Sequence, residues 1–241
     1  MKVIVSSMMS VAVLAGCGVS EPESVSEASQ EIGYGNNIFY DKFDFDPSGP
    51  IAGNAGWTLP AGNVTSCIVV PGAGTDKNLD CSYNGATNGQ GAMSTFDRPA
   101  NRNYHFQFDV WMSGVTETVH GKVFLEHGSG DGGGVIFQIA SGCTGGEVAE
   151  ISATFEYNGP TASLLAAKGC NGHYRVACIW HDAGNQLRCG ASVLPYDPVE
   201  SAFQLINTPE PLGPFNLVRV LGGIGYRNGT TTFDKVQILS D

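Results

Sequence analysis

Basic residues are scarce in this chain of 241 residues. It has 12 lysines and arginines against 23 aspartates and glutamates, which gives a formal net charge of −11 at pH 7. Proteins that bind nucleic acid or anionic lipid headgroups need a basic surface, because lysine and arginine neutralise the phosphates. The composition therefore argues against nucleic acid as a partner and is compatible with neutral glycans or cations.

Several signatures of metal and nucleotide sites are also missing. The histidines form no H-E-x-x-H motif, the cysteines have no C-x-x-C spacing, and no G-x-x-x-x-G-K-[ST] loop is present. We therefore predict no zinc site and no cofactor. The glycine-rich segment 126–132 carries oxygen ligands in Glu126 and Asp131, but it lacks the EF-hand spacing. A hairpin turn is the favoured interpretation of this segment, and a calcium site is the weaker alternative.

The chain has no apolar run of the about 20 residues that a membrane-spanning helix needs. Its apolar N-terminal stretch, Val3 to Gly16, has 14 residues and follows Lys2, which is typical of a secretory signal peptide. The stretch ends in Leu14-Ala15-Gly16-Cys17, which resembles the lipobox of bacterial lipoproteins. That resemblance implies cleavage before Cys17 and lipidation of Cys17. An ordinary secretory signal that happens to contain a cysteine is the alternative.

The segment that follows is poor in apolar residues. Residues 20–30 read SEPESVSEASQ, a composition that cannot bury enough apolar surface to fold. We expect a signal peptide over residues 1–16, a lipidated and disordered tether over residues 17–37, and a folded domain over residues 38–241. Gly18 stands where many Gram-negative lipoproteins of the inner membrane have aspartate, so the resemblance favours the outer membrane. The expected location is the bacterial cell envelope, either periplasmic or surface-exposed, with the membrane contacted through the N-terminal lipid.

Six cysteines remain after Cys17, and an even number in an exported chain predicts disulfides. Among the 15 possible connectivities, proximity in the sequence favours Cys67–Cys81, Cys143–Cys170 and Cys178–Cys189. The third pair also follows from a hairpin. If Ala183-Gly184 is a two-residue turn, Cys178 faces Cys189 and Trp180 faces Leu187, on a face that is apolar throughout.

Long helical periodicity is absent, and alternating strands are plentiful. Residues 104–112 alternate apolar and polar side chains, residues 122–127 and 135–140 follow as strands, and residues 147–158 alternate again. Short turns rich in glycine, asparagine and proline separate them. The pattern predicts an all-β protein, an antiparallel two-sheet sandwich, with one or two helical turns near residues 201–206 as the best helix candidate.

Two weak motifs connect this sandwich to a family. The opening Phe39-Tyr40-Asp41-Lys42-Phe43-Asp44-Phe45 with Gly56-Trp57, and the ending Phe233-Asp234-Lys235-Val236-Gln237-Ile238, are similar to the ends of concanavalin A-like and laminin-G-like jelly rolls. The resemblance covers roughly Asn37 to Leu239. It implies two curved sheets, pairing of the first strand with the last, and a concave side that often faces carbohydrate or another ligand.

The polar faces of the predicted strands supply the candidate site. If they share the concave sheet, a tryptophan lies there among carboxylates, amides and bases, which is what sugar recognition needs. The candidate binding residues are Asp109, Trp111, Glu126, Gln138, Glu156, Arg175 and His181. The alternative is that these residues form only the solvated face of an antiparallel sheet. We expect Trp57 and Trp180 to be buried in the core.

The sequence assigns no catalytic residue. Jelly-roll glucanases commonly carry an E-x-D-x-x-E run, and the chain has none. Glu150 and Glu156 would lie about 20 Å apart along one strand, whereas a retaining glycosidase needs carboxyl groups about 5–5.5 Å apart. A cross-strand pair of Glu126 with Glu156 stays open. The sequence therefore predicts a lipid-anchored, non-catalytic module that binds glycan or another ligand. A polysaccharide-degrading enzyme and a structural lipoprotein without a small ligand are the two alternatives.

Overall fold

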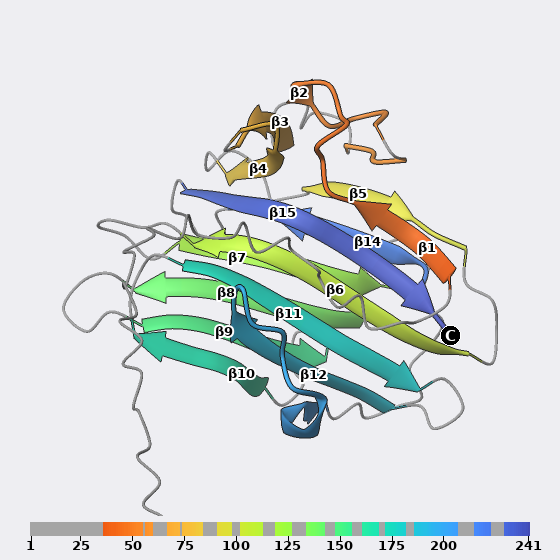
Figure 1. The fold of residues 1–241 in the computed structure, drawn as a ribbon, viewed down its shortest axis with the longest axis vertical. Coiled ribbons are helices and arrows are strands. Elements are labelled where there is room, and N and C mark those ends of the chain that lie inside the picture. The colour runs from red at the N-terminus through yellow and green to blue at the C-terminus, as the bar shows by residue number, and fades with distance from the viewer. Residues whose placement is uncertain are drawn as a thin grey trace, which may run out of the picture. The chain divides into compact units, whose positions relative to one another are not determined.

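The described part of the chain consists almost entirely of strands (Figure 1). The computed structural model describes residues 36–54, 56–59, 67–72, 74–83, 91–97, 102–112, 119–126, 134–142, 148–155, 161–168, 172–181, 186–206, 215–222 and 229–241. Within these residues two antiparallel sheets form, with nine and six strands. The predicted all-β, two-sheet sandwich of the jelly-roll type is confirmed. Among the described residues, no helix has the length and apolar character needed to cross a membrane.

The nine-stranded sheet has the order β13-β12-β11-β6-β15-β4-β3-β2, and β1 also pairs with β15. Its strands are β1 (Asn36–Asp41), β2 (Gly49–Pro50), β3 (Cys67–Pro71), β4 (Lys77–Tyr83), β6 (Asn103–Met112), β11 (Gly172–His181), β12 (Gln186–Val193), β13 (Gln204–Ile206) and β15 (Gly229–Ser240). The pairing of β1 with β15, which the family resemblance implied, is present.

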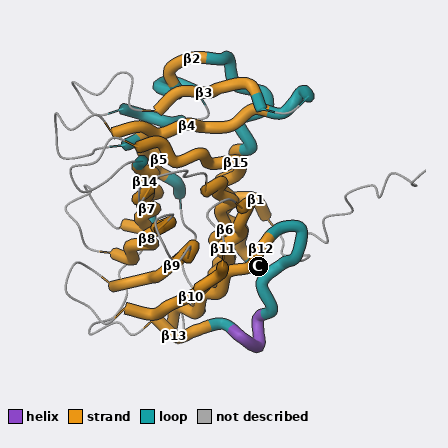
Figure 2. Tube along the Cα trace, turned by 90° about the vertical axis from the view of Figure 1, so that its left-hand side faces the viewer, coloured by secondary structure: helices purple, strands orange, loops and turns teal. Residues whose placement is uncertain are grey.

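The six-stranded sheet has the order β10-β9-β8-β7-β14-β5 and forms the second layer (Figure 2). Its strands are β5 (Ala92–Thr95), β7 (Val119–Glu126), β8 (Gly134–Gly142), β9 (Val148–Phe155), β10 (Thr161–Lys168) and β14 (Leu217–Leu221). The predicted strands near residues 104–112, 122–127, 135–140 and 147–158 correspond to β6, β7, β8 and β9.

The core lies between the two layers, because alternate side chains of each strand point inward. Phe106 and Phe108 of β6 pack against Phe137 of β8, with ring centroids 5.7 and 5.5 Å apart. Trp57 and Trp180 are both buried, as predicted. The Trp57 indole donates a hydrogen bond to the Asp41 carboxylate at 2.6 Å, and this bond fixes the end of β1 to a segment 16 residues later.

Two of the three predicted disulfides lie in the described residues, and both form. Cys178 and Cys189 are direct partners in the β11–β12 register, and Trp180 faces Leu187, as the hairpin argument predicted. Cys67 and Cys81 are bonded across β3 and β4. Cys17, Cys143 and Cys170 lie outside the described residues, and so does the 183–184 turn.

The helix expected near residues 201–206 is reduced to a 3-10 turn over Glu200–Ala202. The residues after it form β13, where Ile206 is buried and pairs with Leu187 of β12. The free edge of the nine-stranded sheet offers hydrogen-bond partners to this backbone, and burial of Ile206 adds apolar contact. Pairing with the sheet therefore replaces the longer helix.

Candidate functional site

The structure separates the predicted binding residues onto the two outer faces of the sandwich. Asp109, Trp111, Arg175 and His181 lie on β6 and β11 of the nine-stranded sheet, whereas Glu126 and Gln138 lie on β7 and β8 of the six-stranded sheet. The expectation of one shared concave face is therefore wrong. Period-2 alternation predicted which side chains point away from the core, but it carries no information about which strands share a sheet. Glu156 lies outside the described residues.

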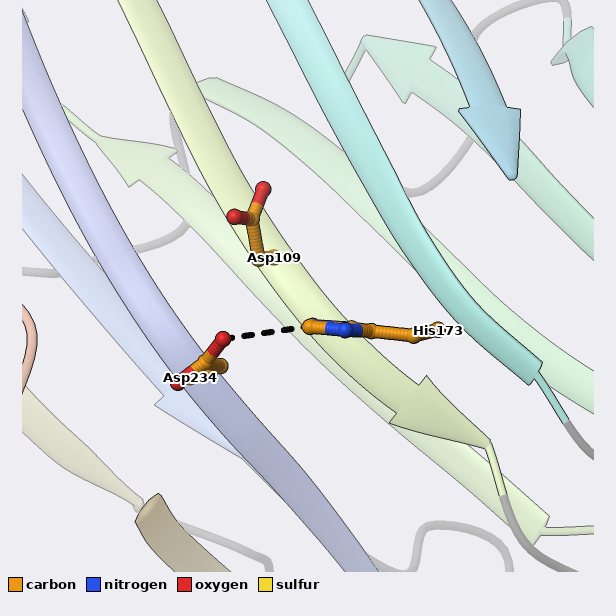
Figure 3. A group of neighbouring side chains, drawn as sticks. All are labelled: Asp109, His173 and Asp234. Atoms are coloured by element: carbon orange, nitrogen blue, oxygen red, sulfur yellow. Dashed lines mark ion pairs between the residues drawn. The ribbon is translucent and has the colours of Figure 1, made fainter. Parts of the chain in front are cut away.

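Trp111 is exposed on β6, with 44% of its surface accessible. Its ring stacks on the imidazole of His173, the cross-strand partner on β11, with centroids 4.1 Å apart and planes 13° apart. His173 in turn places Nε2 3.3 Å from a carboxylate oxygen of Asp234 on β15 (Figure 3). The tryptophan is thus an exposed aromatic ring supported on one face by a side chain that is itself held.

Arg175 occupies the neighbouring position on the same face. Its Nε and Nη2 donate to the two carboxylate oxygens of Asp109 at 2.8 and 2.7 Å, and its Nη1 donates to Asp197. Burial alone would lower the pKa of Arg175, but hydrogen bonds and Coulomb attraction to Asp109 and Asp197 outweigh it and raise that pKa. The pair with buried Asp109 is therefore a fixed part of the face. We call the outward side chains of Asp109, Trp111, His173, Arg175 and Asp234 the β6–β11 face.

Three residues of this face could hold a metal ion. Asp109, His173 and Asp234 each offer one ligand atom, and these atoms lie within 4.8 Å of one another (Figure 3). However, both Asp109 oxygens already accept hydrogen bonds from Arg175. The guanidinium neutralises this carboxylate and its positive charge opposes a second cation nearby. Asp109 is therefore already engaged by Arg175, which argues against a metal ion at this group. The calcium alternative for segment 126–132 lies outside the described residues except for Glu126.

The candidates on the six-stranded sheet do not form a comparable group. Glu126 is buried and ion-paired with Arg219 of β14, whose guanidinium lies 4.5 Å from the centre of the Phe124 ring. Gln138 is exposed on β8. Glu126 pairs with Gly134, while Glu150 of β9 pairs with Ala140 six residues further along β8. Six residues of strand span about 20 Å, so these two carboxylates are too far apart for glycoside hydrolysis.

His181 is on the same sheet as Trp111 but at the opposite end of β11, where it hydrogen-bonds Asn103 at 3.1 Å. Sequence reasoning did not include His173, Asp197 or Asp234 in the site. His173 could have been found, because it has the same parity as Arg175 in an alternating strand. Asp234 sits at a register shift between Phe233 and Lys235, so counting by two fails there. Asp197 lies on a loop after β12, which no strand pattern describes.

Several solved structures have a similar fold. No protein-family model and no curated protein matches the sequence. A family 43 glycoside hydrolase from Bacillus licheniformis superposes with a TM-score of 0.53 at 10% identity, covering 86% of this chain and 40% of that chain. A structure described with endo-acting O-glycanases of the human gut microbiota has a TM-score of 0.56 at 11% identity over 85% of this chain and 99% of that chain.

A third similar structure is a pseudo β-1,3-glucanase of Mycobacterium tuberculosis, also described as an immunostimulatory antigen. It has a TM-score of 0.52 at 13% identity, with 86% of this chain and 100% of that chain covered. At such low identity these likenesses establish the fold alone. Since the names include both a glycoside hydrolase and a pseudo-glucanase, the fold does not decide between catalysis and binding.

Proposed function

We propose that this protein is a non-catalytic carbohydrate-binding module, anchored to the bacterial cell envelope by a lipid on Cys17. The observation that carries the proposal is the exposed Trp111 ring, backed by His173 and surrounded by hydrogen-bonding groups. An indole stacks on the apolar face of a pyranose, while neighbouring carboxylates and amines bind its hydroxyls. The similarity to carbohydrate-active jelly rolls supports the same class of ligand.

The two alternatives make different use of the same residues. A structural lipoprotein without a ligand would have its polar face residues paired with each other, and Asp109, Arg175 and Asp197 are paired in this way. That alternative leaves the exposure of Trp111 unexplained. A polysaccharide-degrading enzyme is favoured by the likeness to glycanases, but the described carboxylates of the six-stranded sheet are too far apart. On the β6–β11 face, both carboxylate oxygens of Asp109 accept hydrogen bonds from Arg175.

The test uses the full chain carrying Cys17→Ser, so that lipid does not interfere with binding to a glycan array and to insoluble polysaccharides. Trp111→Ala should lose about fivefold or more in affinity, if stacking on the indole is worth as much as the about 1–3 kcal/mol of a nucleobase stacked on an aromatic side chain. Phe45→Ala is the control, because Phe45 is an aromatic residue that is 98% exposed and lies outside the β6–β11 face. Equal glycan binding by the Trp111→Ala variant would refute this site, and release of oligosaccharides by the unmodified chain would favour the enzyme.

A further inference from the structure

Both hydrogen-bonding edges of Arg175 are in use. A guanidinium binds an incoming carboxylate or sulfate through two parallel N–H groups, either the Nε–Nη2 edge or the Nη1–Nη2 edge. Asp109 takes the first edge with both of its oxygens, and Asp197 bonds Nη1 on the second. The strongest anion-binding group of the β6–β11 face is therefore occupied by the protein's own carboxylates.

The two carboxylates differ in their surroundings. The Asp109 side chain is 3% exposed and lies beside Arg175 in the strand register, so it belongs to the sheet. The Asp197 side chain is 40% exposed and comes from the loop after β12, which Ser192 ties down by donating to the carbonyl of Tyr196. Asp197 thus reaches Arg175 from the solvent side, which is the side from which a ligand would approach.

Arg175 lies close to Trp111 in the sheet, so the pairing of Arg175 with Asp109 and Asp197 would affect which glycans can bind. Trp111 pairs with His173, and Arg175 lies two residues further along β11 on the same face. Two residues of strand span about 7 Å, so Arg175 lies within the reach of a glycan chain that binds at Trp111 and extends along this face. An unoccupied arginine there would select for uronic acids or sulfated sugars.

We propose that Asp197 excludes anionic glycans from the β6–β11 face by occupying the outer edge of Arg175, and that the face is thereby restricted to neutral glycans. This inference rests on the proposed carbohydrate-binding function. Asp197 is a specificity-determining residue that mimics the carboxylate of an acidic sugar. Lys235 and Lys42 also lie in this region, and each carries a single ammonium without a bidentate fork. The Lys235 ammonium lies 5.8 Å from the Tyr40 ring centre.

The experiment compares three forms of the full Cys17→Ser chain: the parent, Asp197→Ala and Asp76→Ala. The last is the charge control, because Asp76 is exposed outside the β6–β11 face and its removal takes away one negative charge without uncovering Arg175. The affinity of each form is measured for a panel of neutral glucans and for two acidic polymers, polygalacturonate and dextran sulfate. Uncharged dextran is the reference for dextran sulfate. The parent should bind neutral glycans and should not bind the two acidic polymers. The Asp197→Ala variant should gain about tenfold or more in affinity for the acidic polymers. This gain should shrink as the salt concentration rises, and Asp76→Ala should gain much less.

Either of two results would overturn the inference: acidic polymers binding the parent as well as neutral ones, or the two alanine variants gaining equally. Failure of the proposed function looks different. If the parent binds no neutral glycan but Asp197→Ala still gains affinity for the acidic polymers, Arg175 is confirmed as the group that Asp197 blocks. The proposed carbohydrate-binding function is then rejected. Adding Arg175→Met to Asp197→Ala should abolish the gain, and a gain that survives this change would also count against the proposal.

Discussion

His173 stacks on Trp111 with ring centroids 4.1 Å apart, and its Nε2 lies 3.3 Å from Asp234. The three side chains come from β11, β6 and β15, which are neighbours in the nine-stranded sheet. An exposed tryptophan loses rotamer freedom when it binds a sugar, and that loss opposes binding. A ring already held on one face by a neighbour has less freedom to lose. We therefore regard His173 as a positioning residue for Trp111.

The first prediction concerns this support. His173→Ala should weaken glycan binding about three- to tenfold, because Trp111 becomes mobile and more of the ordering entropy opposes association. His173→Phe keeps a planar ring against the indole and should restore most of the affinity. Isothermal titration of the variants separates the two effects, since loss of support appears as a less favourable binding entropy. If the phenylalanine variant is as weak as the alanine variant, His173 contacts the ligand directly instead.

The second prediction concerns pH and Asp41. Burial raises the pKa of Asp41 to about 6 and the nearby Asp46 adds to this, although the Phe43 amide and the Trp57 indole donate to the carboxylate and lower it. Since the pKa of Asp41 in the folded state is higher than its ordinary value of 3.8, the unfolded state releases this proton first as the pH rises. The contribution of Asp41 to stability is therefore greatest below about pH 4 and is lost as the pH rises to about 6.

The size of this effect should be about 2–3 kcal/mol, because one pKa unit corresponds to about 1.4 kcal/mol. Thermal unfolding between pH 4 and pH 7 measures it, and Asp41→Asn should flatten that part of the profile. Asp76→Asn, in an exposed turn, serves as the control. A profile that is unchanged by Asp41→Asn would assign the pH dependence to other groups.

Much of the fold follows from the sequence because it depends on short-range patterns. The β11–β12 hairpin was predictable in register, since alternation and the Cys178–Cys189 pairing select the same alignment. Trp57 and Trp180 were also expected in the core, and both are buried. The hairpin involves residues that lie near one another in the chain, and so one sequence is enough to specify its register.

The site was less predictable, because it depends on long-range pairing. Trp111 and Arg175 were both in the predicted set, yet their partners Asp234 and Asp197 come from a register shift and from a loop. Glu126 was predicted for the same face and lies on the other sheet. Its polar character reflects an ion pair with Arg219 that joins β7 to β14, strands about 90 residues apart in the chain. Alternation within one strand contains no information about such pairings.

The third prediction concerns the Cys178–Cys189 disulfide. Replacing both cysteines with alanine should lower the free energy of unfolding by about 2–4 kcal/mol, because a cross-link over a separation of 11 residues restricts the unfolded chain. Urea unfolding of the oxidised protein measures the change. The Cys67–Cys81 pair, separated by 14 residues, should give a similar loss when it is removed. Peptide mapping without reduction that joined Cys178 to any other cysteine would contradict both the register and this estimate.

The fourth prediction concerns the proposed anchor. In a bacterial host with lipoprotein processing, the chain should incorporate labelled palmitate and partition into the membrane fraction, because two or three acyl chains bind a bilayer firmly where one does not. Cys17→Ser should abolish both, while Cys67→Ser should leave the label in place. Labelling that persists in the Cys17→Ser variant would place the lipid on another residue.

The fifth prediction concerns the buried ion pair on the six-stranded sheet. Glu126 is 1% exposed and accepts a hydrogen bond from Arg219, whose guanidinium also lies over the Phe124 ring. Removing one charge of a buried pair leaves the other without compensation in a medium of low polarity, and such changes cost about 3–5 kcal/mol. Glu126→Gln should therefore lower the free energy of unfolding by an amount in that range.

The double variant Glu126→Gln/Arg219→Met separates the charge from the packing. It removes both charges and keeps an unbranched side chain over Phe124, so most of the lost stability should return. Urea unfolding of the two single variants and the double variant gives a coupling energy, which should be about 2 kcal/mol or more for a buried pair and below about 1 kcal/mol for a solvated one. A small coupling energy would mean that solvent screens this pair, despite the 1% exposure of Glu126. A large one would mean that the pair is shielded from solvent and that its charges stabilise the contact between β7 and β14.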